Sequence, residues 1–183
     1  MPFANSKGVK IHYETDGAGP PLVLQHGFSN SLHGWRDGGY VEALLTDFRL
    51  ILIDARGHGK SDKPHEPAQY DLSIMARDVL AVLDEMGISK AHYWGYSMGG
   101  AIGFALAKMD PGRFLSFILG GSHPYRRASP GATAADNFAE RIAALNQGGM
   151  QPYIALTESQ TGALPPARKA SLMASDPDAL AAI

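Results

Sequence analysis

The sequence contains no cysteine, and this absence excludes disulfides, thiolate nucleophiles and cysteine-ligated metal ions. It also lacks any apolar stretch that approaches the roughly 20 residues a helix needs to cross a membrane. Neither sign of charge dominates, since 16 lysines and arginines stand against 18 aspartates and glutamates. We therefore expect the protein to bind neither nucleic acid nor a membrane surface.

The N-terminus is also poor in hydrophobic residues. The segment MPFANSKGVK has no apolar core of the kind that a secretory signal contains, so we expect a cytoplasmic protein. The chain has 183 residues, 45% of them hydrophobic, which is enough for one domain with a substantial core.

Short apolar runs alternate with segments of helical spacing along the first two thirds of the chain. The runs predict strands, and the helical spacings predict the helices that connect them. The expected strands are 9–15, 22–24, 50–53, 91–94 and 114–119, and the expected helices are 40–45, 72–86 and 98–109. This alternation predicts an α/β protein with a doubly wound, mostly parallel sheet and helices on both faces. Functional sites of such folds form at the carboxyl ends of the strands.

Beyond Tyr125 the strand signals stop and helical signals replace them. Residues 138–147 have helical spacing and end at two glycines, and further helices are expected to start at Pro165-Pro166 and Asp176-Pro177. We therefore expect two parts, residues 1–125 as the N-terminal part of the core and residues 126–183 as a helical lid or cap.

The stretch GYSMGG places one serine between glycines where a predicted strand meets a predicted helix. In a nucleophile elbow the serine has a strained backbone, so the residues two positions before and after it must be small. Gly95 and Gly99 meet this need, and the first N–H groups of the following helix point toward Ser97. We predict that Ser97 is a catalytic nucleophile and that the Met98 N–H helps to bind an oxyanion. The alternative is a tight strand-to-helix turn in which the serine is incidental.

A second oxyanion donor is expected in the loop after an earlier buried strand. The segment LVLQHGFSNS provides this loop, and in it the N–H of Phe28 is the predicted donor. Gly27 allows the backbone to approach closely. His26 is expected to have a structural or pocket-lining role rather than to act as the catalytic base.

The three motifs LQHGF, DARGHGKSD and GYSMGG, in this order, resemble those of the α/β-hydrolase superfamily. The resemblance extends over about residues 7–125 and is closest to the lidded branch of esterases, lactonases, carbon–carbon bond hydrolases and cofactor-free haloperoxidases. It implies that Ser97 is the nucleophile, that Phe28 and Met98 are the oxyanion donors, and that neither a metal ion nor an organic cofactor takes part. A serine at the elbow separates the chain from the branch with aspartate there, which includes haloalkane dehalogenases and epoxide hydrolases.

The run GHGKS at residues 57–61 looks like the end of a phosphate-binding loop. That loop needs a glycine where this sequence has Asp54, whose carboxylate would repel phosphate. It must also open into a helix, but Pro64 and Pro67 follow. We therefore interpret the run as a turn after a buried strand, and the family resemblance implies that Asp54 and Arg56 are structural.

The acid and the base that would activate Ser97 are not evident in the sequence. The superfamily orders its triad as serine, acid and histidine, and only Asp110 and His123 follow Ser97 in that order. Asp110 stands at the far end of the next helix, roughly 18–20 Å from Ser97, and cannot serve. His123 is expected to line the pocket; a surrogate base and a lid-packing residue are its alternatives. The predicted pocket-lining residues are His26, Trp35, Tyr96, His123 and Tyr125, although ordinary packing would also explain the aromatic ones.

Three interpretations of the whole chain stay open. We favour a part of a complete serine hydrolase that acts on a small ester, lactone or related acyl compound. The second is a truncated protein whose apolar strand 114–119 forms an open sheet edge and pairs with another copy or another chain. The third is a non-catalytic ligand-binding protein that keeps the elbow, since an oxyanion hole without a base gives only slow turnover.

Overall fold

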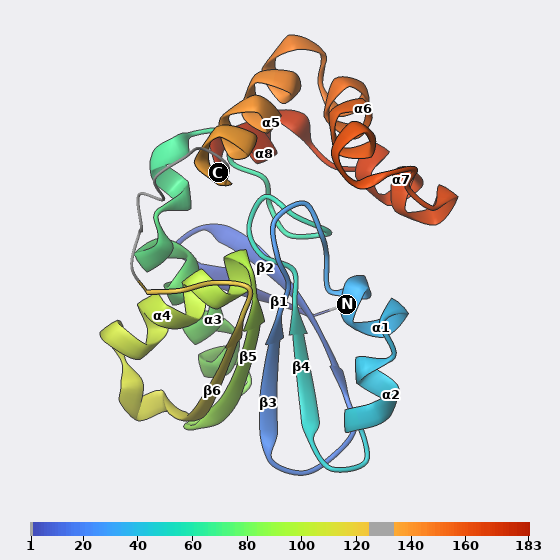
Figure 1. The fold of residues 1–183 in the computed structure, drawn as a ribbon. Coiled ribbons are helices and arrows are strands. Elements are labelled where there is room, and N and C mark those ends of the chain that lie inside the picture. Colours follow the sequence, from blue (N-terminus) through green and yellow to red (C-terminus); the bar gives the residue numbers. More distant parts are fainter. Residues whose placement is uncertain (1, 125–133) are drawn as a thin grey trace.

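The computed structural model describes residues 2–124 and 134–183, and for residues 134–137 the backbone alone (Figure 1). Its six-stranded sheet has the order β1-β2-β4-β3-β5-β6. The strands are β1 (Phe3–Ser6), β2 (Val9–Asp16), β3 (Pro21–Gln25), β4 (Arg49–Ile53), β5 (Ala91–Tyr96) and β6 (Phe114–Gly120). The first two strands are antiparallel to their neighbours, and the other four are parallel. The predicted α/β class with a mostly parallel sheet is confirmed.

Helices cover both faces of this sheet. α1 (His33–Asp37) and α2 (Tyr40–Leu44) lie on one face, and α3 (Leu72–Glu85) and α4 (Met98–Met109) lie on the other (Figure 1). Two short 3-10 turns, Pro67–Tyr70 and Pro111–Arg113, precede α3 and β6. The predicted strands and helices of this part are present, with ends that shift by a residue or two. The sequence did not predict β1 or α1, because four and five residues are too short for a recognisable period.

Neighbouring side chains along β3 and β4 enter two different hydrophobic cores. Val23 and Ile51 pack with residues of α3 and α4, whereas Leu24 and Leu52 pack with residues of α1 and α2. Side chains of a strand alternate between its two faces, so a continuous apolar run fits a strand that is covered on both sides. This is why these runs predicted central strands.

A helical layer lies above the carboxyl ends of the parallel strands (Figure 1). It consists of α5 (Ala134–Gly148), α6 (Met150–Thr161), α7 (Pro166–Met173) and α8 (Pro177–Ala182). The layer has its own buried cluster, which consists of Leu145, Met150, Tyr153, Ile154, Leu172 and Leu180. Phe28, from the loop after β3, packs against this cluster, so the layer contacts the loop where a second oxyanion donor was predicted.

Three of these four helices were predicted. α7 begins at Pro166, and α8 is capped by the side chain of Asp176, which accepts hydrogen bonds from two backbone N–H groups of the first turn. α6 was missed because Pro152 interrupts its first turn and its apolar residues follow no clear period. The division into a core and a lid stays a prediction.

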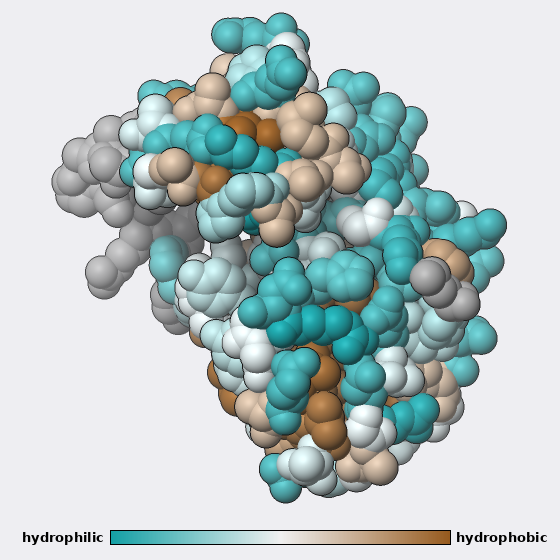
Figure 2. Space-filling view, turned by 90° about the vertical axis from the view of Figure 1, so that its right-hand side faces the viewer, coloured by the Kyte–Doolittle hydropathy of each residue, from teal (hydrophilic) through white to brown (hydrophobic). Residues whose placement is uncertain are grey.

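The molecular surface is mostly hydrophilic on the face drawn in Figure 2. Hydrophobic side chains reach this face within the helical layer and in one strip over the sheet part. In the part of the chain that the structure describes, no helix is long and apolar enough to cross a membrane.

Candidate active site

Ser97 stands at the turn between β5 and α4 with a strained backbone. Its φ of 53° and ψ of −113° lie outside the regions that residues with a side chain normally adopt. A backbone of this kind costs on the order of 1–3 kcal/mol and is found mainly at functional sites. Ser97 is therefore held in place by its surroundings, as the elbow pattern predicted.

The glycines around Ser97 are required by close packing. A Cβ at Gly95 would collide with the carbonyl group of Gly99, and a Cβ at Gly99 would collide with that of Gln25 at the end of β3. The buried hydroxyl of Tyr93 donates a 2.7 Å hydrogen bond to the same Gly99 carbonyl. These contacts bring the first turn of α4 against the ends of β3 and β5.

Gly27 brings the loop after β3 directly against Ser97. A Cβ placed at Gly27 would lie 3.2 Å from the Ser97 Cβ and 3.2 Å from the Tyr96 carbonyl oxygen. Among the described residues, the N–H of Phe28 has no hydrogen-bond acceptor, and the Met98 N–H is one of the first N–H groups of α4, which lack an acceptor within the helix. Two free N–H groups therefore lie in segments that border Ser97.

Two buried histidines form hydrogen bonds with the backbone of this loop. Nδ1–H of His26 donates to the Gly27 carbonyl at 2.8 Å, and its Nε2 accepts the Ala55 N–H at 3.0 Å. In the same way Nδ1–H of His58 donates to the Arg56 carbonyl at 3.0 Å, and its Nε2 accepts the Ser29 N–H at 3.1 Å. Each ring serves one donor and one acceptor and is therefore neutral. Burial lowers the pKa of His26, and it lowers that of His58 to about 3.

The side chains of Asp54 and Arg56, in the turn after β4, form buried contacts of their own. The Asp54 carboxylate accepts hydrogen bonds from the Leu32 N–H, the Lys60 N–H and the His12 ring at 2.8–3.0 Å. These hydrogen bonds outweigh the effect of burial and lower the pKa of Asp54. Arg56 forms two hydrogen bonds of 2.6 Å with the buried carboxylate of Asp78. Both side chains are committed to internal contacts, and the turn GHGKS is followed by no helix that could complete a phosphate-binding loop.

A pocket of about 200 Å³ opens beside Gly27 and Tyr96. It is lined by His26, Gly27, Asn30, Gly34, Trp35, Tyr40, Trp94 and Tyr96. The rings of Trp35, Tyr40 and Trp94 meet edge to face, with centroids 5.3–5.5 Å apart. The predicted residues His26, Trp35 and Tyr96 thus lie on its wall, whereas His123 is exposed and does not. Tyr125 lies outside the described residues.

The sequence alone did not point to Tyr40 and Trp94. Their rings meet only because α2 packs on β5, and no local pattern of residues records that contact. Asn30 and Gly34 were likewise missed, although they follow the Phe28 loop closely and could have been suspected from that position.

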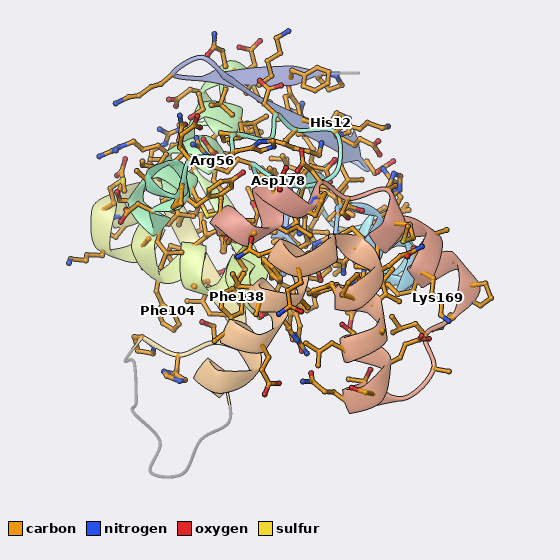
Figure 3. The ribbon with its side chains drawn as sticks, turned by 90° about the horizontal axis from the view of Figure 1, so that it is seen from above. His12, Arg56, Phe104, Phe138, Lys169 and Asp178 are labelled. Atoms are coloured by element: carbon orange, nitrogen blue, oxygen red, sulfur yellow. The ribbon has the colours of Figure 1, made fainter. Side chains whose placement is uncertain are left out.

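The helical layer contacts the loop that carries Phe28. The Phe28 ring meets the ring of Phe138 on α5 at a centroid distance of 5.3 Å, and Figure 3 labels Phe138. The hydroxyl of Tyr153 on α6 donates to Ser29 Oγ at 3.0 Å. The layer is therefore in contact with the segment next to the candidate nucleophile.

No histidine hydrogen-bonds to Ser97 Oγ among residues 2–124 and 134–183. Asp110 stands at the far end of α4 and is its C-cap. A triad cannot be assembled from the residues that the structure describes.

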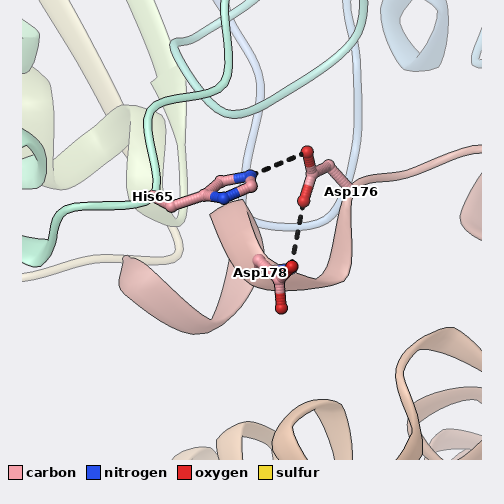
Figure 4. A group of neighbouring side chains, drawn as sticks. All are labelled: His65, Asp176 and Asp178. Carbon is pink, nitrogen blue, oxygen red and sulfur yellow. Dashed lines mark hydrogen bonds and ion pairs between the residues drawn. The ribbon is translucent and has the colours of Figure 1, made fainter.

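One group of described residues has the composition of a metal site. The ligand atoms of His65, Asp176 and Asp178 lie within 4.8 Å of one another (Figure 4). One Asp176 oxygen already caps α8, and the other binds His65 Nε2 at 3.1 Å. We interpret the group as an ion pair that joins the loop after β4 to α8.

The family model for the alpha/beta hydrolase fold matches residues 20–173. The chain belongs to this family. The match includes the Phe28 loop, the GHGKS turn, the elbow and most of the helical layer, so the sequence resemblance is confirmed.

Solved structures and curated relatives agree with this assignment. A hydrolase from Pseudomonas aeruginosa is 32% identical, with a TM-score of 0.80 over 99% of this chain and 69% of that one. The N-acyl homoserine lactone degrading enzyme Est816 is 26% identical, with a TM-score of 0.69 over 98% of this chain and 69% of that one. Bifunctional epoxide hydrolase 2 of Sus scrofa is 34% identical over 107 residues, which are 58% of this chain and 19% of that protein. The chain spans about half or less of the length of the curated relatives it matches.

Proposed function

We propose that the chain acts as part of a serine hydrolase that cleaves a carboxylic ester, a lactone or a related acyl substrate through an acyl-enzyme on Ser97. The observation that carries the proposal is the strained backbone of Ser97 at the N-terminus of α4, directly against Gly27. In a purely structural turn this strain would have no benefit. In a nucleophile elbow the strained conformation exposes the serine hydroxyl to the substrate.

The chemistry follows the order of acyl transfer. Ser97 Oγ attacks the substrate carbonyl carbon while a base takes the hydroxyl proton, and negative charge develops on the carbonyl oxygen. The N–H groups of Phe28 and Met98 are the donors that we assign to this oxyanion, helped by the positive end of α4. The alcohol then leaves with a proton, and water cleaves the acyl-enzyme to release the acid and regenerate Ser97. The base is not assigned to a residue.

The pocket lined by Trp35 and Tyr96 is the site that we propose for an apolar group of the substrate. Four aromatic rings line its wall beside the polar side chains of His26 and Asn30, and the rings suit a hydrocarbon chain or a ring of the substrate.

Hydrolysis of p-nitrophenyl acetate by the wild-type chain and by Ser97→Ala tests this proposal. We expect a measurable rate that falls at least tenfold in the variant, because removal of the nucleophile leaves only weak catalysis by the oxyanion donors. Equal rates for the two proteins would rule out Ser97 as the nucleophile.

A ligand-binding protein without turnover is the second candidate. It is favoured by the lack of a histidine partner for Ser97 Oγ among the described residues. Saturable binding of a small ester in the aromatic pocket, with no hydrolysis beyond that of Ser97→Ala, would support this candidate over the enzyme.

Pairing of chains through β6 is our proposal for a protein partner. β6 has a single neighbour in the part of the sheet that the structure describes, and Leu115 and Ile118 on it are 54% and 53% exposed. An apolar edge strand of this kind tends to pair with another strand, here one of a second copy. Light scattering after size-exclusion chromatography should report a dimer, and a monomer at all concentrations would contradict it.

A further inference from the structure

Arg168 on α7 reaches down from the helical layer toward the loop after β3. Its Nη2 lies 3.4 Å from Ser29 Oγ, the same oxygen that accepts the hydroxyl hydrogen of Tyr153. Ser29 follows the predicted oxyanion donor Phe28 by one residue. The guanidinium is therefore placed at the border between the layer and the candidate active site.

This guanidinium has no carboxylate partner among residues 2–124 and 134–183. Other arginines of the chain are paired: Arg36 pairs with Glu14 and Asp16, and Arg113 pairs with Asp84, at distances of 2.6–2.8 Å. Burial without a compensating anion lowers the pKa of Arg168, yet an arginine stays charged at neutral pH. A half-buried positive charge without a partner is unfavourable unless an anion joins it.

Arg168 also lines a cavity that is large enough for such an anion. The cavity has a volume of about 370 Å³ and lies between α7 and the segment 30–37. It shares Asn30 and Gly34 with the aromatic pocket, so the two cavities lie next to each other along this segment. Asp37 lines the same cavity but forms no ion pair with Arg168.

The positive charge of Arg168 affects His26, a residue of the candidate active site. Burial is the main cause that lowers the pKa of His26, and the positive charge of Arg168 lowers it further. His26 holds the carbonyl of Gly27, which lies against Ser97. A ligand bound to Arg168 would therefore lie beside the loop that borders the candidate nucleophile.

We propose that Arg168 binds a carboxylate of the substrate, so that the preferred substrate is an ester or lactone with a second, anionic group. The inference rests on the proposed function. Guanidinium and carboxylate form paired, charge-assisted hydrogen bonds, and the cavity that Arg168 lines adjoins the aromatic pocket. Arg168 is a specificity-determining residue and takes no part in bond cleavage.

Two esters of equal chain length test the inference, monomethyl adipate with a free carboxylate and neutral methyl hexanoate. Initial rates follow from acid release in a pH-stat with the full chain. We expect Arg168→Gln to raise the KM of monomethyl adipate about 10- to 100-fold, the effect of losing one charge-assisted pair, with kcat nearly unchanged. The KM of methyl hexanoate should change less than twofold.

The neighbouring cation gives a matched control. Lys169 pairs with Glu158 at 2.7 Å, and Figure 3 places it at the outer rim of the layer. Lys169→Gln removes the same charge from the same helix and should leave both esters within twofold of the wild type. An equal loss for both esters in Arg168→Gln, or no change for either, would overturn the inference.

A binding experiment separates this inference from the proposed function. Trp35 and Trp94 line the adjoining pocket, so their fluorescence should report binding of monomethyl adipate to Ser97→Ala without turnover. The additional change Arg168→Gln should weaken this binding about 10-fold or more. If Ser97→Ala hydrolyses both esters at the wild-type rate but the binding difference persists, the nucleophile assignment fails and the carboxylate site stands. A lack of saturable binding, or a Kd that Arg168→Gln leaves unchanged, refutes the carboxylate site.

Discussion

The N–H of Ser97 donates a 2.8 Å hydrogen bond to the carbonyl of Gly120, which joins the elbow to the end of β6. On the opposite side the backbone of Gly27 lies against the Ser97 side chain. Ser97 is thus held between the end of β6 and the loop after β3, and these two strands flank β5. These contacts keep it at a positive φ that an isolated serine would not adopt.

Replacement of Ser97 by glycine should stabilise the protein relative to replacement by alanine. Glycine adopts a φ of 53° without steric cost, whereas alanine keeps the strain, so the free energy of unfolding should differ by about 1 kcal/mol in favour of Ser97→Gly. Urea unfolding of the two variants measures this difference. An alanine variant as stable as the glycine variant would show that the elbow holds no strain.

Removing one partner of the buried ion pair between Arg56 and Asp78 should destabilise the protein more than replacing both partners. Arg56→Leu leaves the Asp78 carboxylate buried without its partner, and we expect the free energy of unfolding to fall by about 3–5 kcal/mol. The double variant Arg56→Leu/Asp78→Leu removes both charges and should be more stable than the single variant. Chemical unfolding of the three proteins decides this, and a loss below about 1 kcal/mol in the single variant is incompatible with the prediction.

Stability should fall with acidification because His58 is buried in its neutral form. Its pKa is lowered from 6.5 to about 3, so between these values the unfolded chain binds a proton that the folded chain does not. The stabilisation is complete above pH 6.5 and is lost as the pH falls toward 3, at about 1.4 kcal/mol per pH unit for one such group.

Urea unfolding between pH 7 and pH 4.5 tests the role of His58. His58→Gln should flatten the pH dependence, whereas His33→Gln, at an exposed position, should retain the wild-type slope. The prediction is wrong if wild type and His58→Gln lose stability in parallel.

The contact between His65 and Asp176 should weaken as the pH rises (Figure 4). The hydrogen bond to Asp176 raises the pKa of His65. The contact therefore stabilises the folded chain fully below pH 6.5, the ordinary value, and this contribution disappears as the pH rises through the raised one.

Hydrogen exchange of the α8 amides in wild type and His65→Asn measures this contact. At pH 6 the wild type should be better protected than the variant, and at pH 8.5 the two should be alike. A difference of equal size at both pH values would mean that the protonated imidazole is not what holds α8.

The fold and the elbow were predictable because their determinants are local in the sequence. Apolar runs such as that of β4 indicate burial on both faces of the sheet. Gly95 and Gly99 reflect the need for small residues beside Ser97. The assignments of Phe28 and Met98 as oxyanion donors were inferred from the same motifs, and they stay predictions.

The remainder of the site depends on contacts between distant segments. Trp94 meets Tyr40 only through the packing of α2 on β5, and Arg168 reaches Ser29 only because α7 docks above the loop after β3. The two members of each pair are far apart in the sequence, so no local period or spacing predicts their contact. The exposure of His123 likewise follows from how the chain leaves β6, which its position alone did not reveal.

The acyl-enzyme on Ser97 can be trapped and located by mass. The wild-type chain and Ser97→Ala are mixed with p-nitrophenyl acetate, quenched with acid during the first turnovers, digested and analysed by peptide mass spectrometry. We expect an acetyl group on the peptide that contains Ser97, at Ser97 itself, in the wild type and not in the variant. An unmodified Ser97 in the wild type while p-nitrophenol is released, or acetylation at another residue that accounts for turnover, would contradict it.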